Sequence, residues 1–279
     1  MPAWKAAWLA GIHRTARKIE KGGFRDSRVE EDQKLSVNAR PVVPIDLEAV
    51  ILAGGLGSRL RPVVNDRPKP MALVGGKPFL EWLIKDLRNQ GVQRLILCVG
   101  YMGETIEGYF GSGHEQGLDI VYSREAAPLG TGGAIKLALP KLRGPRFFAL
   151  NGDSLCDFSL RAMLNTHIER SASATLWLVS VDDGERYGAV KIDDNQEITE
   201  FREKSATGQA GMINAGVYLL DRHILEPMPE NKVCSLEKDL FPGLVGHGIV
   251  GVVGQGPFID IGTPESYEFA ERFVNRSRA

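Results

Sequence analysis

The sequence predicts an α/β protein whose mostly parallel, mixed sheet is flanked by helices, a Rossmann-like arrangement. Short apolar runs alternate with segments of helical spacing between residues 49 and 150, which is typical of parallel strands joined by helices. After residue 174, several strand-like runs follow one another, and two of them flank a tight turn, which indicates antiparallel pairs. The first apolar run ends in a glycine-rich loop, at the sheet edge where ligands of such folds lie.

The elements of the first half follow from local patterns. Residues 49–53 predict a strand, because five apolar residues are long enough for a buried strand and too short for a helix. Apolar side chains at helical spacing predict a helix over 78–90, which Gly91 ends. Further strands are expected at 95–99, 119–122 and 146–150, with helices ending near 110 and spanning 130–139. This alternation predicts parallel strands with right-handed crossovers.

The second half contains more strands than helices. A strand is expected at 174–181 and another at 215–220, and a hairpin is expected from 189–192 and 198–201 around Asp194-Asn195. The remaining expected elements are a helix over 236–245, with a break at Pro242-Gly243 as the alternative, short strands at 249–253 and 258–260, and a closing helix over 264–274.

Composition excludes several classes of protein. The chain has 279 residues, 43% of them hydrophobic, which suffices for the core of one large or two small domains. Its net charge of −1 argues against a nucleic-acid binder. No apolar run is long enough to span a bilayer. The three cysteines, Cys98, Cys156 and Cys234, are widely spaced and form no zinc pattern, so we expect reduced thiols and a cytoplasmic location.

Residues 1–47 differ from the rest and are expected to form an N-terminal arm and linker. Apolar residues near Trp4 and Trp8 share one helical face and precede a basic stretch, the wrong order for a signal peptide. A flexible, dispensable extension is the favoured interpretation, and an arm that docks on a partner or a membrane surface is the alternative.

The loop after the first strand carries the strongest chemical signal. Three glycines in the four positions 54–57 let backbone N–H groups approach an anion closely. Ser58 is expected to cap a following helix, Arg59 supplies a permanent charge, and Lys69 is held between two prolines. The loop matches neither the Walker A pattern nor the dinucleotide fingerprint. It predicts a polyphosphate site, with a purely structural turn as the alternative.

Two strings in this region reveal a family resemblance. Gly54-Gly55-Leu56-Gly57-Ser58-Arg59-Leu60-Arg61-Pro62, followed by Pro68-Lys69-Pro70, resembles the signature of the sugar-phosphate nucleotidyltransferases. The resemblance covers residues 48 to about 274. It implies the nucleotide-diphospho-sugar transferase fold, and an enzyme that joins a nucleoside triphosphate to a sugar 1-phosphate, giving an NDP-sugar and pyrophosphate. It also implies one catalytic domain, 48–279, with a mainly nucleotide-binding half, 48–153, and a mainly sugar-binding half, 154–279. Assembly into a homo-oligomer stays open.

The resemblance also implies roles for individual residues. Those expected to contact the nucleotide are Leu52, Ala53, Gly54, Gly55, Gly57, Ser58, Glu125, Pro128, Gly130, Thr131 and Asp153. Those expected to contact the sugar phosphate are Gly188, Glu203, Lys204 and Asn214. Arg59, Lys69 and Lys204 are the expected catalytic residues, and Asp153 and Asp260 the expected ligands of Mg²⁺. Each aspartate follows an apolar run, where a carboxylate is a natural magnesium ligand, although either could instead cap a turn.

The identities of base and sugar are narrower expectations. Glu125 favours GTP, because a carboxylate only accepts hydrogen bonds and guanine offers two donors on one edge; a solvated surface glutamate is the alternative. Val63-Val64 and the strings PVVNDRPKPM, PLGTGGAI and FIDIGTPESY resemble the heptose-phosphate branch, which implies D-glycero-α-D-manno-heptose 1-phosphate as substrate. Mannose 1-phosphate is the closest competitor, and MurNAc or glucose 1-phosphate follow. An inactive regulatory subunit is the non-enzyme alternative.

Overall fold

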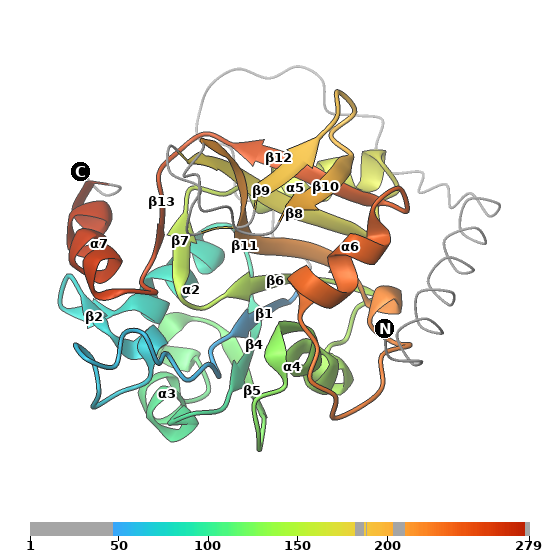
Figure 1. Cartoon of the computed structure of the whole chain (residues 1–279). Helices are drawn as coiled ribbons and strands as arrows, with labels where there is room; N and C mark the ends of the chain where they lie inside the picture. The colour runs from blue at the N-terminus through green and yellow to red at the C-terminus, as the bar shows by residue number, and fades with distance from the viewer. Residues whose placement is uncertain (1–46, 182–186, 188, 203–209, 277–279) are drawn as a thin grey trace, which may run out of the picture.

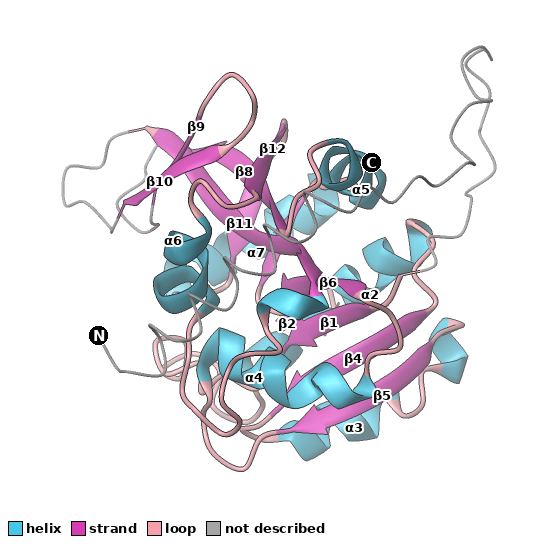
Figure 2. Ribbon diagram, turned by 90° about the vertical axis from the view of Figure 1, so that its right-hand side faces the viewer, coloured by secondary structure: helices cyan, strands magenta, loops and turns pink. Residues whose placement is uncertain are grey.

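A single mixed sheet organises the molecule (Figure 1). The computed structural model describes residues 47–181, 187, 189–202 and 210–276, and the predicted arm therefore lies almost wholly outside the described residues. In the described part, β1 (Ala49–Leu52) pairs in parallel with both β4 (Arg94–Val99) and β6 (Arg146–Asn151). Beyond β4, β5 (Asp119–Arg124) adds a fourth parallel strand. Figure 2 shows these strands side by side with their carboxyl ends at one edge.

The rest of the sheet is mostly antiparallel. β11 (Gly211–Asp221) runs antiparallel to β6 and to β8 (Ala174–Val181), and β12 (Ile249–Gly254) pairs in parallel with β8. The hairpin of β9 (Ala189–Ile192) and β10 (Ile198–Arg202) extends the sheet from the first part of β11. The predicted mixed α/β sheet is therefore confirmed.

Helices cover both faces because successive strand residues point to opposite sides. On β1, Ile51 belongs to one buried apolar cluster and Val50 to the other. The cluster around Ile51 includes side chains of α2 (Phe79–Asn89), α3 (Gly103–Phe110), α5 (Leu160–Glu169) and α7 (Pro264–Arg276). The cluster around Val50 includes side chains of α4 (Gly130–Ala138) and α6 (Phe241–Leu244). Within the described residues, no helix combines the length and apolar character needed to cross a membrane.

Short elements complete the described fold. β2 (Leu73–Val74) pairs with β3 (Lys77–Pro78), and β7 (Ser154–Cys156) pairs with β13 (Phe258–Asp260). Single turns of 3₁₀-helix lie at Lys69–Met71, His114–Gln116, Leu139–Lys141 and Arg222–Ile224, and a π-helical turn lies at Leu236–Leu240. The β7–β13 pair matters most for function, because it brings a C-terminal strand to the end of β6.

Two local predictions differ from the structure. The helix expected after Ser58 is wrong: residues 58–63 form turns, with the amide of Leu60 bonded to the Gly57 carbonyl at 2.9 Å. Pro62 lacks the N–H that a continuing helix would use there. Helix α5 was not expected, although Ser159 caps it by accepting a hydrogen bond from the Ala162 amide at 3.1 Å.

The second half also differs in detail from expectation. β11 begins at Gly211, before the predicted start at residue 215, and its register shifts between Asn214 and Tyr218. At the shift, Gly216 has a φ of 75°, which glycine adopts more readily than other residues. Residues 236–244 are helical as expected, and the alternative of a break at Pro242 does not occur, because this proline lies in the first turn of α6, where its missing N–H costs nothing.

Candidate active site

One cavity lies at the carboxyl ends of the parallel strands. It has a volume of about 380 Å³ and is lined by every residue predicted to contact the nucleotide, together with Arg59 and Lys69. Cys98, Asn151 and Gly262 also line it and were not predicted. Asn151 ends β6 as a polar residue after four buried ones, a signal that could have identified it.

The glycine loop packs directly on Lys69. Gly57 has a φ of 59°, and a Cβ atom at this position would lie 2.8 Å from Cβ of Lys69, so a larger residue would displace the lysine. The Lys69 side chain is only 12% exposed, and its Nζ lies 2.6 Å from Oδ2 of Asp153. The loop after β1 and the end of β6 thus place a cation and a carboxylate in contact beside the cavity.

Asp260 reaches the same region through the β7–β13 pair. It lies opposite Ser154 in the strand register, and the next residue, Ile261, donates its amide hydrogen to the Asp153 carbonyl at 3.0 Å. Oδ1 of Asp260 accepts a hydrogen bond from the Gly262 amide at 2.6 Å, and the Tyr187 hydroxyl donates to Oδ2. Strand pairing therefore brings the two predicted metal ligands to neighbouring backbone positions.

Arg59 lies on the same side of the cavity. A Cβ atom at Gly262 would lie 3.5 Å from Nη2 of Arg59, so the guanidinium is next to the Asp260 turn. Among the described residues, no group of three or more histidine, cysteine and acidic side chains could hold a metal by itself. Two carboxylates nevertheless suit Mg²⁺, which is usually bound by one or two of them together with substrate phosphates and water.

Glu125 lies beside the cavity wall and is not a freely solvated side chain. Its Oε2 accepts a hydrogen bond from the Leu129 amide at 3.0 Å. Its Oε1 lies against the backbones of Gly54 and Gly100, since Cβ atoms there would come within 2.7 and 2.9 Å of it. Burial raises the pKa of Glu125, and the Leu129 hydrogen bond opposes this shift only in part.

The thiol of Cys98, which also lines the cavity, is expected to be unreactive. Burial and the charge of Glu125 raise the pKa of Cys98 to about 12, so the thiol stays protonated at neutral pH. The three cysteines are buried and form no disulfide with one another. We therefore assign no nucleophilic role to Cys98 although it lines the cavity.

The predicted sugar-side residues are only partly described. Gly188, Glu203 and Lys204 lie outside the described residues. Asn214 is half-buried on β11, where its Nδ2 donates to the Tyr218 hydroxyl at 2.9 Å. Asn214 does not line the nucleotide cavity, but its hydrogen bonds lead toward Thr131, as described below.

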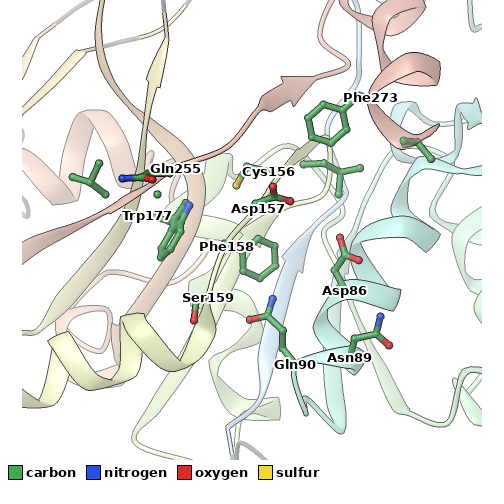
Figure 3. A pocket seen from close by; sticks show the side chains of 14 residues that line it. Asp86, Asn89, Gln90, Cys156, Asp157, Phe158, Ser159, Trp177, Gln255 and Phe273 are labelled. Carbon is green, nitrogen blue, oxygen red and sulfur yellow. The ribbon is translucent and has the colours of Figure 1, made fainter. Parts of the chain in front are cut away.

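A second cleft of about 610 Å³ lies among α2, β7, β12 and α7. Figure 3 shows Asp86, Asp157 and Trp177 around it. Its two carboxylates would repel phosphate groups, so this cleft does not suit a nucleotide. Trp177 Nε1 is buried and has no hydrogen-bond partner among the described residues, and a Cβ at Gly254 would lie 2.5 Å from it.

Comparison with known proteins agrees with this geometry. A family model described as nucleotidyl transferase matches residues 48–277. A D-glycero-alpha-D-manno-heptose 1-phosphate guanylyltransferase from Aneurinibacillus thermoaerophilus is 42% identical over 227 residues, which are 81% of this chain and 97% of the relative. A mannose-1-phosphate guanylyltransferase from Mycobacterium tuberculosis is 37% identical over 79% of this chain and 62% of the relative.

A solved structure is similar over the same region. HddC from Yersinia pseudotuberculosis, in complex with GMP-PN, is 36% identical and superposes with a TM-score of 0.72, over 82% of this chain and 99% of that one. The family model and the relatives confirm the resemblance found in the signature loop. With most of its length matched, this chain belongs to the nucleotidyl transferase family.

Proposed function

We propose that this protein joins GTP to a sugar 1-phosphate and releases pyrophosphate, and that the sugar is D-glycero-α-D-manno-heptose 1-phosphate. The observation that carries the proposal is the convergence of the glycine loop, Arg59, Lys69 and Asp153 on one cavity, with a half-buried glutamate at its wall. Such a cavity offers backbone groups and cations to phosphates and a hydrogen-bond acceptor to a base.

The reaction we propose is an in-line displacement. An oxygen of the sugar 1-phosphate attacks the α-phosphorus of GTP, a new P–O bond forms, and the bond to the bridging oxygen of pyrophosphate breaks. The attacking oxygen is already anionic, so the site needs no strong general base. Catalysis then consists of positioning and charge neutralisation, with Arg59 and Lys69 beside the triphosphate and Lys204 beside the nucleophile.

Asp153 and Asp260 are the residues that would hold Mg²⁺. Their oxygens are hard donors, Asp153 directly precedes β7 and Asp260 ends its partner strand β13, and further coordination positions would remain for phosphates and water. The bound ion would neutralise charge on the phosphates of the two substrates. Tyr187 and the Gly262 amide orient the Asp260 carboxylate for this task.

Glu125 and the relatives support a guanine nucleotide. The carboxylate of Glu125 accepts hydrogen bonds only, as recognition of the guanine N1–H and N2–H edge requires. The two relatives described above are named guanylyltransferases, and HddC was solved with GMP-PN. The heptose enzyme has the higher identity, 42% against 37%, which favours the heptose phosphate over mannose 1-phosphate, the second candidate.

Pyrophosphate release tests these assignments directly. The protein is incubated with each of GTP, ATP, UTP and dTTP, paired in turn with heptose, mannose, glucose and MurNAc 1-phosphates. GTP with the heptose phosphate is expected to have the highest kcat/KM. A preference for UTP or dTTP would overturn the guanine assignment, and a higher kcat/KM with mannose 1-phosphate would overturn the heptose. Folded protein that is inactive with every pair would support the inactive regulatory subunit.

A further inference from the structure

A single carboxylate connects the nucleotide cavity with the strand that carries Asn214. Glu237 lies in the π-helical turn Leu236–Leu240. Its Oε1 accepts a hydrogen bond from the Tyr218 hydroxyl at 3.0 Å. Its Oε2 accepts from the Thr131 hydroxyl at 2.8 Å and from the Ser235 hydroxyl at 2.7 Å. Because an ionised carboxylate only accepts, all three hydroxyls must point their hydrogens toward Glu237.

On the nucleotide side, this arrangement holds the first turn of α4. Thr131 lines the cavity, and its oxygen also accepts a hydrogen bond from the Leu236 amide at 2.8 Å. The carbonyl of Cys234 accepts from the amides of Gly132 and Gly133 at 2.9 and 3.2 Å. These contacts use groups at the N-terminus of α4, so Cys234, Leu236 and Glu237 hold this turn in place.

On the other side, the same carboxylate orients Asn214. Tyr218 is fully buried; burial, followed by the charge of Glu237, raises its pKa well above the usual value, so its hydroxyl remains a donor. With its hydrogen on Glu237, the Tyr218 oxygen can accept from Nδ2 of Asn214 at 2.9 Å. Oδ1 of Asn214 accepts from the Gly216 amide at 2.9 Å, so both ends of the amide are determined.

We propose that Glu237 is a positioning residue that fixes Thr131 on the nucleotide side and Asn214 on the sugar side relative to each other. It keeps the attacking oxygen of the sugar phosphate in register with the α-phosphorus of GTP. The inference rests on the proposed function for the assignment of Asn214 to the sugar. Its physical basis is that reacting atoms must be held within a few tenths of an ångström of the productive geometry.

Three variants separate the two branches from the carboxylate that joins them. Thr131→Val removes the hydroxyl on the nucleotide side and is expected to raise KM for GTP about tenfold, with KM for the sugar phosphate unchanged. Tyr218→Phe removes the acceptor that orients Asn214 and is expected to raise only KM for the sugar phosphate, by about as much. Glu237→Gln keeps the volume but replaces an acceptor by a donor, so both KM values rise and kcat falls about tenfold.

A double-mutant cycle measures the coupling. Because Glu237 acts on Asn214 through Tyr218 in this proposal, the Glu237→Gln/Tyr218→Phe double variant is expected to have the same KM for the sugar phosphate as Tyr218→Phe alone. Additive effects of the two substitutions would show that they act independently, and the proposal would be rejected.

Ser235→Ala is the structural control. Ser235 donates to the same carboxylate and accepts from the Lys238 amide at 3.2 Å, but it reaches neither substrate branch. We expect this variant to lower the melting temperature and leave both KM values unchanged. If Glu237→Gln behaves in the same way, losing stability with both KM values and kcat intact, Glu237 only stabilises the fold and the inference fails.

Binding of GTP alone distinguishes this failure from failure of the proposed function. Calorimetry on the wild-type protein and on the Thr131→Val and Glu237→Gln variants needs no sugar phosphate. Suppose that both variants bind GTP more weakly than the wild-type protein, and that the wild-type protein uses none of the sugar phosphates. This result would support the nucleotide branch and reject the assignment of Asn214 to the sugar. Equal binding by all three proteins would reject Glu237 as a positioning residue. A wild-type protein that binds no GTP would reject both proposals.

Discussion

Nζ of Lys69 lies 2.6 Å from Oδ2 of Asp153, although 84 positions separate the two residues along the chain. The lysine comes from the turn that follows the glycine loop, and the aspartate follows β6. Their side chains are 12% and 37% exposed, so the lysine is largely buried while the carboxylate stays partly open to solvent, which limits what the pair contributes to stability. Their contact instead marks where phosphate charge and a metal ligand would meet.

Replacing this lysine tests that interpretation. Lys69→Met removes one positive charge from the phosphate site and also removes the ion pair between Lys69 and Asp153. We expect kcat/KM to fall about a hundredfold or more, because fixed charges near transferring phosphates act mainly on the transition state, while the melting temperature changes little. Steady-state kinetics and thermal melts measure the two effects. Lys77→Met, which removes a lysine paired with Glu81, is the matched control, and equal kinetics for both variants would contradict the role of Lys69.

Arg59 is expected to matter more for turnover than for folding. It is exposed at the cavity, so Arg59→Ala should leave the free energy of unfolding almost unchanged. We expect kcat to fall roughly a thousandfold, the scale of an arginine that stabilises transferring phosphates. Arg61→Ala is the control, because Arg61 lies over the Tyr101 ring at 4.7 Å and does not line the cavity. Near-normal turnover of Arg59→Ala would remove this arginine from the mechanism.

The raised pKa of Glu125 leads us to expect an unusual pH dependence of nucleotide affinity. Because burial raises its pKa above the usual 4.5, the carboxylate begins to be protonated at a higher pH than an ordinary glutamate. Protonation removes the charged acceptor, so Kd for GTP should increase as the pH falls toward this raised pKa. Calorimetry between about pH 5 and pH 8 measures the effect.

The corresponding variant should abolish this dependence. Glu125→Gln has no titrating group, and its amide presents a donor to the guanine edge. We expect GTP affinity to fall roughly tenfold to a hundredfold, with ATP affinity little changed. Glu107→Gln, which changes a glutamate of α3 that is paired with Arg124, is the matched control. An unchanged GTP-to-ATP ratio in Glu125→Gln would mean that another group selects the base.

Cys98 is expected to resist alkylation in the folded protein. Its pKa is raised to about 12 by burial and by Glu125, so at about pH 8 almost none of it is thiolate, the reactive form. Iodoacetamide should therefore leave Cys98 unmodified in native protein and modify it fully after denaturation, as read by peptide mass spectrometry. Modification of native Cys98 within minutes would show that the cavity wall opens.

The buried side chain of His167 leads us to expect that the protein loses stability in mild acid. It is fully buried, with Nδ1 2.8 Å from the Thr175 hydroxyl and Nε2 3.3 Å from Oδ1 of Asp221. Burial lowers its pKa below 6.5, and the nearby Asp221 carboxylate only partly opposes the shift. The unfolded chain therefore binds a proton below about pH 6.5 that the folded chain excludes, so the free energy of unfolding falls as the pH drops through that range.

Urea unfolding at about pH 7.5 and about pH 5.5 measures this effect. His167→Asn removes the titration at this site, and we expect it to reduce the pH dependence while lowering stability at both values. His223→Asn is the comparison, since burial also lowers the pKa of His223, although the side chain is less buried. An unchanged pH dependence in His167→Asn would assign the acid sensitivity to other groups.

Local patterns predicted much of the fold because they reflect forces between near neighbours. β8 and the start of α7 match their expected bounds, since a nearly continuous apolar run covers most of β8 and helical spacing marks α7. The helix expected after Ser58 was wrong because a good capping residue does not compensate for a following proline. α5 was missed although Leu160, Met163 and His167 are buried at helical spacing, because the polar residues between them masked the pattern.

The candidate site was also predicted only in part from the sequence. The nucleotide-side residues were predicted from short separate motifs that resemble those of the family, and the structure brings them around one cavity. Their individual roles, the metal ligands and the sugar-side residues remain predictions. The contacts of Tyr187 with Asp260 and of Thr131 with Glu237 were not predicted, because each joins segments that only the order of strands makes neighbours.

By itself, the sequence determined the α/β class through its strand and helix periodicity, and it indicated the nucleotidyl transferase family through the resemblance of its glycine-rich signature, because both are properties of short segments. Only the tertiary structure decided which distant side chains meet: Lys69 with Asp153, Asp260 beside Ser154, and Glu237 between Thr131 and Tyr218. Pairings of this kind depend on the register of strands and on the packing of helices on the sheet, which are settled by burial of the whole core.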